Sequence, residues 1–423
     1  MLQLAQLRSN PELIKEKLSI KHFTNTALVD EIIMLDDERK TLNFKFEETK
    51  AKINAASKEI GALLKSGDKE GSIQKKAEVE QWKADNSPVE QQLVVVEKKL
   101  TDLLVLLPNL PSPLVPKGRT PEDNEVVRNG GKTSELYTGA LPHWDLAKKY
   151  NLIDFELGNK LTGSGFPVYK GRGAKLQRAL IQYFLDYNTS AGYTEYMPPL
   201  MVNESSAFGT GQLPDKEGQM YYVTADDLYL VPTAEVPLTN IYRDVIVKES
   251  ELPIKMTAYT PCFRREAGSY GKDVRGLNRL HQFDKVEIVQ LVPATSSYEV
   301  LDEMVAHVEQ LIQSLGLQYR ILRLCGGDMS FASALTYDFE VYSAAQERWL
   351  EVSSVSNFET FQANRMKIRY KDGEGKSQQV HTLNGSSLAL PRILACLLEN
   401  HQTEDGILLP TVLHSYYGSA TVS

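Results

Sequence analysis

The 423-residue chain has only three cysteines, Cys262, Cys325 and Cys396. They lie far apart and none belongs to a CxxC pair, so the sequence lacks the usual spacing of a structural zinc site or a disulfide framework. The histidines include no HExxH pair, and we expect no zinc centre. Unpaired cysteines suit a reducing compartment, which favours the cytoplasm.

A long hydrophobic run is also missing. No stretch of about 18 apolar residues occurs, so no membrane span is predicted. The first 18 residues lack the apolar core of a signal peptide. The chain has no basic excess either, because its formal net charge is −8. This charge weighs mildly against a nucleic-acid binder, although a local basic patch would suffice.

Two common nucleotide motifs are absent. The sequence contains neither a GxxxxGK[ST] loop nor a GxGxxG loop after a strand. A nucleotide site would therefore use arginines on a sheet. What remains is a globular composition, with 42% hydrophobic and 24% charged residues, and a length that predicts two domains.

Two heptad runs fill the N-terminal part, and their spacing is that of a coiled-coil seam. The first run contains Ile32, Leu35, Arg39, Leu42, Phe46, Thr49, Ile53, Ala56, Ile60 and Leu63. The second contains Val79, Trp82, Asn86, Val89, Leu93, Val96, Leu100, Leu103 and Leu107. A turn-forming stretch over residues 65–71 separates them. The pattern predicts an antiparallel two-helix coiled-coil arm, roughly 50–60 Å long at about 1.5 Å per residue.

Proline marks this arm and its end. Pro88 lies inside the second run, where a lost hydrogen bond predicts a kink, but the heptad phase continues and one bent helix is expected. Pro108, Pro111 and Pro113 then form a stiff linker. We therefore predict an N-terminal domain over residues 1–110 and a second domain over residues 111–423.

Beyond residue 120, short β-rich runs alternate irregularly with amphipathic helices. The strand-like runs cover residues 228–232, 285–292 and 339–342, and the helix-like ones cover residues 174–187 and 297–315. Because strands and helices do not alternate strictly, the second domain is predicted to be α+β with an antiparallel sheet.

A strand hairpin that carries arginines is the first candidate site. Residues 261–266 lead into a glycine-rich loop over residues 267–278 with a mobile, positively charged tip, and the chain returns through residues 279–287. Arg264 could hold a phosphate through its guanidinium, and Phe283 could stack on a base. The alternative is an ordinary surface hairpin with Arg–Glu pairs, and spacing alone gives both interpretations about equal weight.

Two later segments add polar groups. Alternation places Glu351 and Ser353 on one face of a predicted strand, and a carboxylate beside a hydroxyl suits Mg²⁺ held by nucleotide phosphates. Spacing alone favours a half-exposed strand instead. Gly385 precedes an apolar helix that contains Arg392. The glycine permits close approach to a ligand and the arginine could meet a terminal phosphate, whereas the alternative is a plain helix start.

Together these segments resemble the class II aminoacyl-tRNA synthetases. Arg264, Glu266 and residues 279–283 resemble motif 2 of that class, and residues 385–392 resemble motif 3. Residues 192–199, after a long helix, resemble the dimer-forming motif 1.

Within the class, the chain is similar to the seryl-tRNA synthetases. Residues 231–240 resemble that family's serine-binding loop, residues 209–214 and 384–386 also look like it, and the arm matches its tRNA-binding arm. The resemblance spans essentially the whole chain. Pro391 departs from it, because many relatives carry glycine before the arginine.

The resemblance implies a catalytic domain built on a mixed, mainly antiparallel β-sheet flanked by helices. It implies a homodimer that uses ATP and Mg²⁺ to convert L-serine into seryl-adenylate. The seryl group would then pass to the 3′ adenosine of tRNA(Ser), and charging of tRNA(Sec) is left open. The enzyme would act in the cytoplasm, away from membranes.

The resemblance also assigns residues to roles. Catalysis would use Arg264, Glu266 and Arg392. L-serine would contact Thr233, Ala234, Glu235, Arg264, Glu287, Asn384 and Ser386, with Glu287 near the hydroxyl and Glu235 near the ammonium. ATP would contact Arg264, Arg265, Glu266, Phe283, Glu351, Val352, Ser353, Ser354 and Arg392. Mg²⁺ would be held by Glu351 and Ser354.

Two other functions share part of this pattern. A synthetase-like ligase that loads an amino acid onto a carrier protein would not need the long arm. A non-catalytic RNA-binding relative would be signalled by loss of Arg264, Glu266 or Arg392, and all three are present. The arm is not basic overall, so its tRNA contacts are expected on one face or at the tip, at Lys65, Lys69, Lys75 and Lys76.

Overall fold

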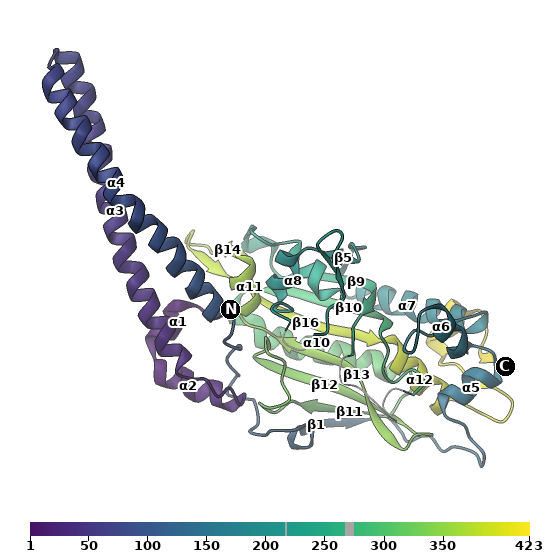
Figure 1. Ribbon diagram of the computed structural model, residues 1–423. Coiled ribbons are helices and arrows are strands. Elements are labelled where there is room, and N and C mark those ends of the chain that lie inside the picture. The colour runs from purple at the N-terminus through teal and green to yellow at the C-terminus, as the bar shows by residue number, and fades with distance from the viewer. Residues whose placement is uncertain (216–217, 267–274) are drawn as a thin grey trace. The chain divides into compact units, whose positions relative to one another are not determined.

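The computed structural model describes residues 1–215, 218–266 and 275–423 (Figure 1). Its internal contacts divide the chain into two compact units. The first, the arm unit, comprises Leu2–Ser19 and Phe23–Pro108. The second, the sheet unit, comprises Met1, Ile20–His22 and Asn109–Ser423. The tip of the predicted arginine hairpin, residues 267–274, lies outside the described residues.

The arm unit consists of helices α1 (Leu4–Ser9), α2 (Pro11–Ile20), α3 (Leu28–Ser66) and α4 (Lys69–Leu104). The heptad pattern is confirmed, because buried residues of α3 and α4 follow it. They include Ile32, Leu35, Leu42, Ala56, Val79, Leu93, Val96 and Leu100. Helix α4 runs through Pro88 as one element, as expected, whereas the kink stays a prediction.

The turn between the long helices is shorter than the seven-residue stretch in the sequence predicts. Only Gly67 and Asp68 lie outside α3 and α4. Gly67 adopts the left-handed conformation, with φ of 85°, and ends α3. Asp68 caps α4 by accepting a hydrogen bond from the amide of Gly71 at 2.9 Å. Good capping at both ends therefore lets the helices extend into a stretch that composition marks as a turn.

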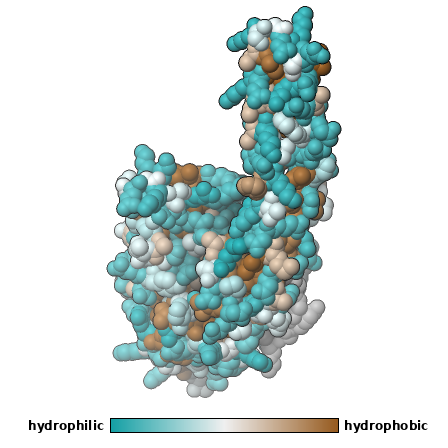
Figure 2. Space-filling model, turned by 90° about the vertical axis from the view of Figure 1, so that its left-hand side faces the viewer, coloured by the Kyte–Doolittle hydropathy of each residue, from teal (hydrophilic) through white to brown (hydrophobic). Residues whose placement is uncertain are grey.

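The surface of the arm is mostly polar, but apolar side chains interrupt it. Met34, Phe44, Ile73, Val94 and Val95 are each more than half exposed. Figure 2 shows brown atoms among the teal ones along the helices. No helix in the described ranges is both long enough and apolar enough to cross a membrane.

The sheet unit is built on eight strands. In spatial order they are β1 (Glu125–Gly130), β11 (Tyr319–Arg323), β12 (Leu335–Ser343), β13 (Arg348–Asn357), β16 (His381–Ala389), β10 (Gln282–Val292), β9 (Ile254–Phe263) and β4 (Thr194–Glu195). Every neighbouring pair is antiparallel except β4 with β9, which is parallel. The predicted α+β class with a mixed, mainly antiparallel sheet is confirmed.

Three long helices pack on this sheet. Helix α7 (Arg172–Ser190) contacts β9 and β10, α10 (Ser297–Ser314) contacts β13 and β16, and α12 (Leu390–Asn400) contacts β10, β12 and β13. Their apolar faces supply buried core residues, among them Phe184 from α7, Val308 from α10 and Leu394 from α12. Burial of these faces holds the strands rigid, and the strands position the site.

Shorter elements complete the unit. The helices are α5 (His143–Lys149), α6 (Phe155–Leu161), α8 (Glu204–Thr210), α9 (Glu235–Asn240), α11 (Phe361–Met366) and α13 (His414–Tyr417). The small sheets pair β2 (Ile153–Asp154) with β3 (Val168–Tyr169), and β17 (Ile407–Leu408) with β18 (Thr421–Val422). A third joins β5 (Met201–Val202), β7 (Leu228–Leu230) and β6 (Tyr222–Val223), and a fourth joins β15 (Ser377–Gln379), β14 (Arg369–Lys371) and β8 (Ile246–Lys248).

Candidate functional site

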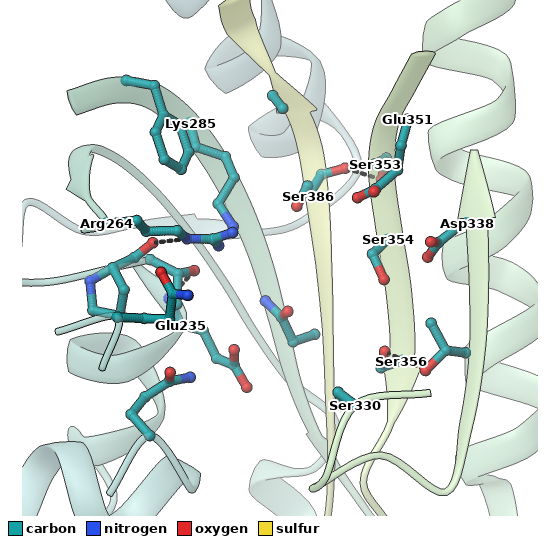
Figure 3. Close-up of a pocket in the computed structure, with 18 of the residues that line it drawn as sticks. Glu235, Arg264, Lys285, Ser330, Asp338, Glu351, Ser353, Ser354, Ser356 and Ser386 are labelled. Carbon is teal, nitrogen blue, oxygen red and sulfur yellow. Dashed lines mark hydrogen bonds between the residues drawn. The ribbon is translucent and has the colours of Figure 1, made fainter. Parts of the chain in front are cut away.

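A cavity of about 690 Å³ opens over the middle of the large sheet, a volume typical of small-ligand sites. Figure 3 shows Arg264 and Lys285 on one side, Glu351, Ser354 and Asp338 on the other, and Ser386 of β16 between them. The predicted site residues that line it are Thr233, Glu235, Arg264, Glu266, Phe283, Glu351, Val352, Ser353, Ser354, Asn384, Ser386 and Arg392.

Three predicted site residues are not among the described residues that line the cavity. Ala234 is fully buried and packs in a core cluster with Leu238 and Met256, so its side chain faces away from the site. Arg265 donates its backbone amide to the carbonyl of Gln219 at 2.9 Å. Glu287 is completely buried and lies behind the wall.

One end of the cavity, here called the polar end, is lined by Thr233, Asn384 and Ser386, and the buried Glu287 holds these three side chains. One carboxylate oxygen accepts a hydrogen bond from the Thr233 hydroxyl at 2.8 Å, and the other accepts one from the Asn384 amide at 2.8 Å. The Ser386 hydroxyl lies at 3.5 Å. The ammonium of Lys285, a residue that the sequence analysis missed, forms an ion pair with the same carboxylate. Three segments far apart in sequence thus converge on one buried charge.

Glu235 supplies a second buried carboxylate. It is the first residue of α9, and its oxygen accepts a hydrogen bond from Nε2 of Gln362 at 2.7 Å. Burial raises the pKa of the Glu235 carboxyl to about 7, with the Gln362 hydrogen bond opposing and the nearby Glu287 adding to the rise. Gln362, also missed from the sequence, is itself fixed by the Thr382 hydroxyl at 2.6 Å.

Arginines and an aromatic ring gather at the other end. The guanidinium of Arg264 lies over the Phe283 ring, 5.2 Å from its centroid, and Nε donates to the carbonyl of Pro232 at 3.3 Å. Glu266 forms an ion pair with Arg279 across the hairpin. The pairing of β9 with β10 sets Phe283 opposite Cys262, which brings these side chains together. A planar cation above an aromatic face suits a nucleotide phosphate beside a base.

Strand β13 carries the acidic wall, and its alternation is not regular. Its register against β12 shifts between Phe339 and Glu340, so that Val352 has no opposite residue. As a result of this bulge, Glu351 and Ser354 lie opposite Glu340 and Asp338 on one face, whereas Ser353 lies opposite the buried Phe339. The expected pairing of Glu351 with Ser353 on one face is therefore replaced by Glu351 with Ser354, although all three residues line the cavity. The Ser353 hydroxyl is occupied, because it donates to the carbonyl of Ser386 at 2.6 Å.

Arg392 lies in the first turn of α12 and lines the cavity next to Glu351. Its Nη1 donates to the carbonyl of Glu351 at 2.7 Å, and its Nε donates to the carbonyl of Asn278 at 3.1 Å. Pro391 occupies the start of that helix, where proline costs no hydrogen bond. The departure at Pro391 therefore leaves the arginine in the cavity wall.

Asp338 is the acidic residue that the sequence analysis overlooked. It lines the cavity opposite Ser354 in the β12–β13 pairing. Burial and the neighbouring Glu351 raise the pKa of the Asp338 carboxyl well above its usual value, and its Oδ1 has no hydrogen-bond partner among the described residues. Its position just before the strand-like run at residues 339–342 is the signal that the sequence offered.

The acidic wall fits a magnesium ion. The described residues contain no group of three or more His, Cys, Asp or Glu side chains arranged to hold a metal. Mg²⁺ needs few protein ligands, since it keeps several waters and is commonly completed by substrate phosphates. Glu351, Asp338 and the Ser354 hydroxyl could supply a few of the ligands of such an ion. The ion would also neutralise the two neighbouring carboxylates.

The sequence matches two known families and many curated proteins. Residues 1–111 match the family described as the seryl-tRNA synthetase N-terminal domain, and residues 221–401 match the class II tRNA synthetase core domain (G, H, P, S and T). A serine–tRNA ligase from Salinibacter ruber is 48% identical over 427 residues, covering 100% of this chain and 99% of the relative. The chain belongs to the seryl-tRNA synthetase family.

Other members of the seryl-tRNA synthetase family agree over the same span. A serine–tRNA ligase from Methylacidiphilum infernorum is 46% identical, covering 99% of both chains. The crystal structure of a seryl-tRNA synthetase from Pyrococcus horikoshii complexed with ATP superposes with a TM-score of 0.90 at 32% identity, covering 100% of this chain and 99% of that one. The seryl-tRNA synthetase fold therefore extends over both the arm unit and the sheet unit.

Proposed function

We propose that this chain activates L-serine with ATP to form seryl-adenylate and pyrophosphate, and then transfers the seryl group to the 3′ end of tRNA(Ser). One observation carries the proposal. A single cavity joins a small polar end, built around Glu235 and Glu287, to an arginine- and aromatic-lined end that contains Arg264, Phe283 and Arg392.

Activation needs charge neutralisation more than covalent chemistry. An oxygen of the serine carboxylate attacks the α-phosphorus, and the bond to the departing pyrophosphate breaks. Arg264 would hold both the α-phosphate and the serine carboxylate, since its Nε bonds to the carbonyl of Pro232, next to Thr233, while its guanidinium lies over Phe283. Phe283 would stack on adenine and Arg392 would bind the γ-phosphate. Glu266 would keep Arg279 and the hairpin in place through their ion pair.

Recognition of serine follows from the buried carboxylates. Glu235 would receive the ammonium group, which favours its ionised form. Glu287 would act on the hydroxyl through the Thr233, Asn384 and Ser386 side chains that it holds. Alanine would leave these polar groups unpaired, at about 1–3 kcal/mol each, whereas threonine would be rejected mainly by size.

Glu351, Ser354 and Asp338 would hold Mg²⁺ against the ATP phosphates. When bound, the ion would offset the negative charge of the phosphates during adenylate formation. The proximity of Asp338 to Glu351 supports this assignment, because burial and then repulsion by Glu351 raise the pKa of Asp338, and a cation would relieve that repulsion.

The larger assembly is part of the same proposal. Residues 1–110 would form the tRNA-binding domain and residues 111–423 the catalytic domain of a cytoplasmic homodimer, with tRNA(Sec) as a second substrate to test. Strand β4 is an edge of the large sheet. Nearby Met197 is 94% exposed, and Leu200 and Met201 are exposed as well, which supports a subunit contact at motif 1.

The proposal is tested by following labelled serine. The full chain, given ATP and Mg²⁺, is expected to form an acid-stable ester on tRNA(Ser) that is lost after mild alkali. A carrier protein mixture serves as the competing acceptor. Labelling of a carrier protein without labelling of tRNA(Ser) would replace this function by that of a synthetase-like ligase.

A further inference from the structure

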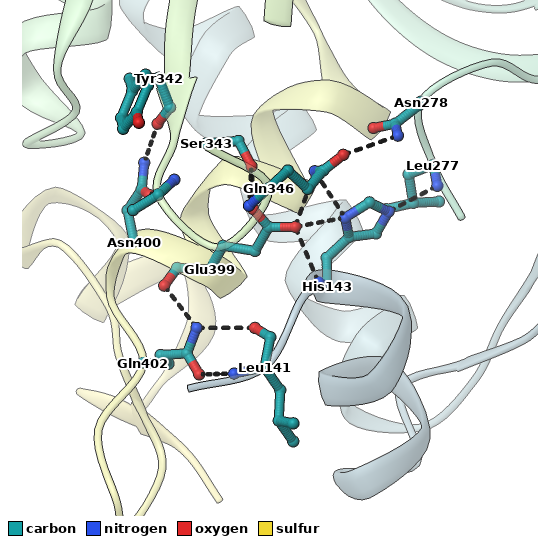
Figure 4. Close-up of polar contacts among 11 residues, drawn as sticks. Leu141, His143, Leu277, Asn278, Tyr342, Ser343, Gln346, Glu399, Asn400 and Gln402 are labelled. Carbon is teal, nitrogen blue, oxygen red and sulfur yellow. Dashed lines mark hydrogen bonds and ion pairs between the residues drawn. The ribbon is translucent and has the colours of Figure 1, made fainter. Parts of the chain in front are cut away.

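A buried polar network lies beside the cavity, between α5 and the end of α12 (Figure 4). Its centre is Glu399, which is completely buried together with His143. One Glu399 oxygen accepts hydrogen bonds from the His143 amide at 2.9 Å, from Nδ1 of His143 at 2.7 Å and from Nε2 of Gln346 at 2.9 Å. The other oxygen accepts one from the Ser343 hydroxyl. Burial of a carboxylate is costly unless hydrogen-bond donors satisfy it, and these four donors fix Glu399 and its partners in one arrangement.

The hydrogen-bond partners of the His143 ring show which of its two nitrogens carries the proton. Its Nε2 lies 2.8 Å from the backbone nitrogen of Leu277. A backbone N–H can only donate, so Nε2 is the acceptor and Nδ1 carries the proton toward Glu399. The histidine is therefore a bridge between a buried carboxylate and Leu277, near the end of the hairpin loop.

A second path leaves Glu399 through Gln346. The side-chain oxygen of Gln346 accepts a hydrogen bond from Nδ2 of Asn278 at 3.0 Å. The network thus holds the last two residues of the hairpin loop, Leu277 and Asn278, through His143 and Gln346.

The residues just before them are fixed against α5 as well. The guanidinium of Arg275 lies over the Trp144 ring, 4.4 Å from its centroid. Gly276 has φ of +66°, and a Cβ at this position would lie 2.2 Å from Nε2 of His143. Only glycine permits this close approach, so the end of the hairpin is packed tightly onto the network.

Asn278 connects the network to the cavity. Its carbonyl accepts the hydrogen bond from Nε of Arg392, whose Nη1 is held by the carbonyl of Glu351. Two backbone carbonyls and the Glu351 carboxylate, 3.5 Å from Nη1, thus hold the guanidinium, and Gln346 bonds to the side chain of the residue that supplies one of these carbonyls. Small displacements of a charged group that binds a transferred or departing phosphate reduce its effect strongly.

We infer that His143, Glu399 and Gln346 are positioning residues: Gln346 holds Asn278 directly, His143 holds the neighbouring Leu277, and Glu399 fixes both side chains, so that the Asn278 carbonyl sets the guanidinium of Arg392 for the terminal phosphate of ATP. The inference rests on the proposed function, because that function assigns the γ-phosphate to Arg392. It predicts a defect that depends on the terminal phosphate and not on adenine or serine.

The test compares ATP with AMP, which lacks that phosphate. Gln346→Met keeps the length of a half-buried side chain and removes its hydrogen bonds to Asn278 and Glu399. Calorimetry on the full chain with Mg²⁺ is expected to show ATP bound about tenfold more weakly and AMP bound within twofold of the parent. Gln402→Met is the matched control, because Gln402 bonds to Leu141 and to the carbonyl of Glu399, on the side away from Asn278. Its ratio of ATP to AMP affinity should equal that of the parent.

Three further outcomes decide the inference. Equal weakening of ATP and AMP by Gln346→Met would show a general structural role and overturn it, as would no change in either affinity. In an Arg392→Ala background, Gln346→Met should cause no additional loss of ATP affinity, and an additive loss would also contradict it. If Gln346→Met does not fold, Asn278→Ala breaks the same side-chain bond and should reproduce the selective ATP defect.

Failure of the proposed function would look different. In that case the parent chain itself would show no serine-dependent exchange of pyrophosphate into ATP. A parent with normal exchange, combined with a Gln346→Met variant whose ATP-to-AMP ratio is unchanged, would reject the positioning network alone.

Discussion

The arm unit buries mainly apolar side chains along its seam, whereas the site in the sheet unit is built around buried carboxylates. In the arm, apolar residues repeat every seven positions along each of the two long helices, so the pattern that forms the seam can be recognised within a single helix. In the sheet unit, the decisive buried groups are charged, and Glu287 gathers partners from residues 233, 285, 384 and 386. The arm is therefore specified locally, whereas the site depends on strand register across the sheet.

The difference predicts where mutations act. Truncating a seam leucine such as Leu93 should cost about 2–5 kcal/mol of arm stability and leave the cavity chemistry intact. Changing one partner of a buried carboxylate should instead impair the site directly, because an unpaired buried charge is costly. Four experiments test this contrast, from the largest expected effect to the smallest.

The first experiment removes the central arginine of the cavity. Arg264→Ala should reduce serine-dependent ATP–pyrophosphate exchange by ~10³-fold, because loss of a group that stabilises transition-state charge typically costs 10²–10³-fold or more. Arg264→Lys should also fail substantially, since a point charge does not replace the planar guanidinium. Circular dichroism and sedimentation should show a folded protein of unchanged oligomeric state. Exchange within a few-fold of the parent would exclude this role.

The second experiment removes the arm. Replacing residues 35–100 by a short Gly-containing turn should preserve most of the exchange reaction and reduce charging of tRNA(Ser) by ~10²-fold. Because phosphate contacts release counterions, tRNA affinity of the intact chain should fall with salt, and the shortened chain should show a shallower slope. Charging at the parental rate would mean that the arm has another purpose.

The third experiment removes the buried Glu287 carboxylate at the polar end of the cavity. Glu287→Ala should weaken serine activation by tens-fold or more, because Lys285, Thr233 and Asn384 would all lose their shared partner. ATP affinity, measured by equilibrium binding, should change only a few-fold. A variant that binds ATP poorly but keeps its serine affinity would reverse this assignment.

The fourth experiment varies pH. The pKa of Glu235 is raised to about 7, so its carboxyl is largely protonated in the free protein below that pH. The serine ammonium needs the ionised form, and binding must therefore displace a proton at acidic pH. Serine affinity should fall by roughly fivefold to tenfold between pH 7.5 and pH 6. In Glu235→Gln, affinity should be weaker and nearly independent of pH, and an unchanged pH profile would argue against the ammonium contact.

The sequence predicted the arm well because a heptad period is a local signal. It also identified the segments that carry Arg264, Glu351 and Arg392, which the structure brings into one cavity. It predicted a turn over residues 65–71 that is longer than the observed one, because composition does not show that Gly67 ends one helix and Asp68 caps the next.

Other features depend on contacts between distant segments. Lys285, Asp338 and Gln362 are unremarkable in the sequence, and only strand pairing and helix packing bring them to the site. The bulge at Val352 replaced the expected alternation, and only the pairing of distant strands brings Thr233 and Asn384 onto the buried Glu287, whose role toward the serine hydroxyl stays a proposal. Spacing in one strand carries no information about its register with the next.

The most direct measurement of the central claim is ATP–pyrophosphate exchange by the full chain with each of the twenty amino acids in turn. Serine should support exchange well above all others, with alanine reduced by ~10²-fold or more because it leaves the polar groups around Glu287 unpaired. Exchange that is absent with serine, or equally fast with alanine, would contradict the account.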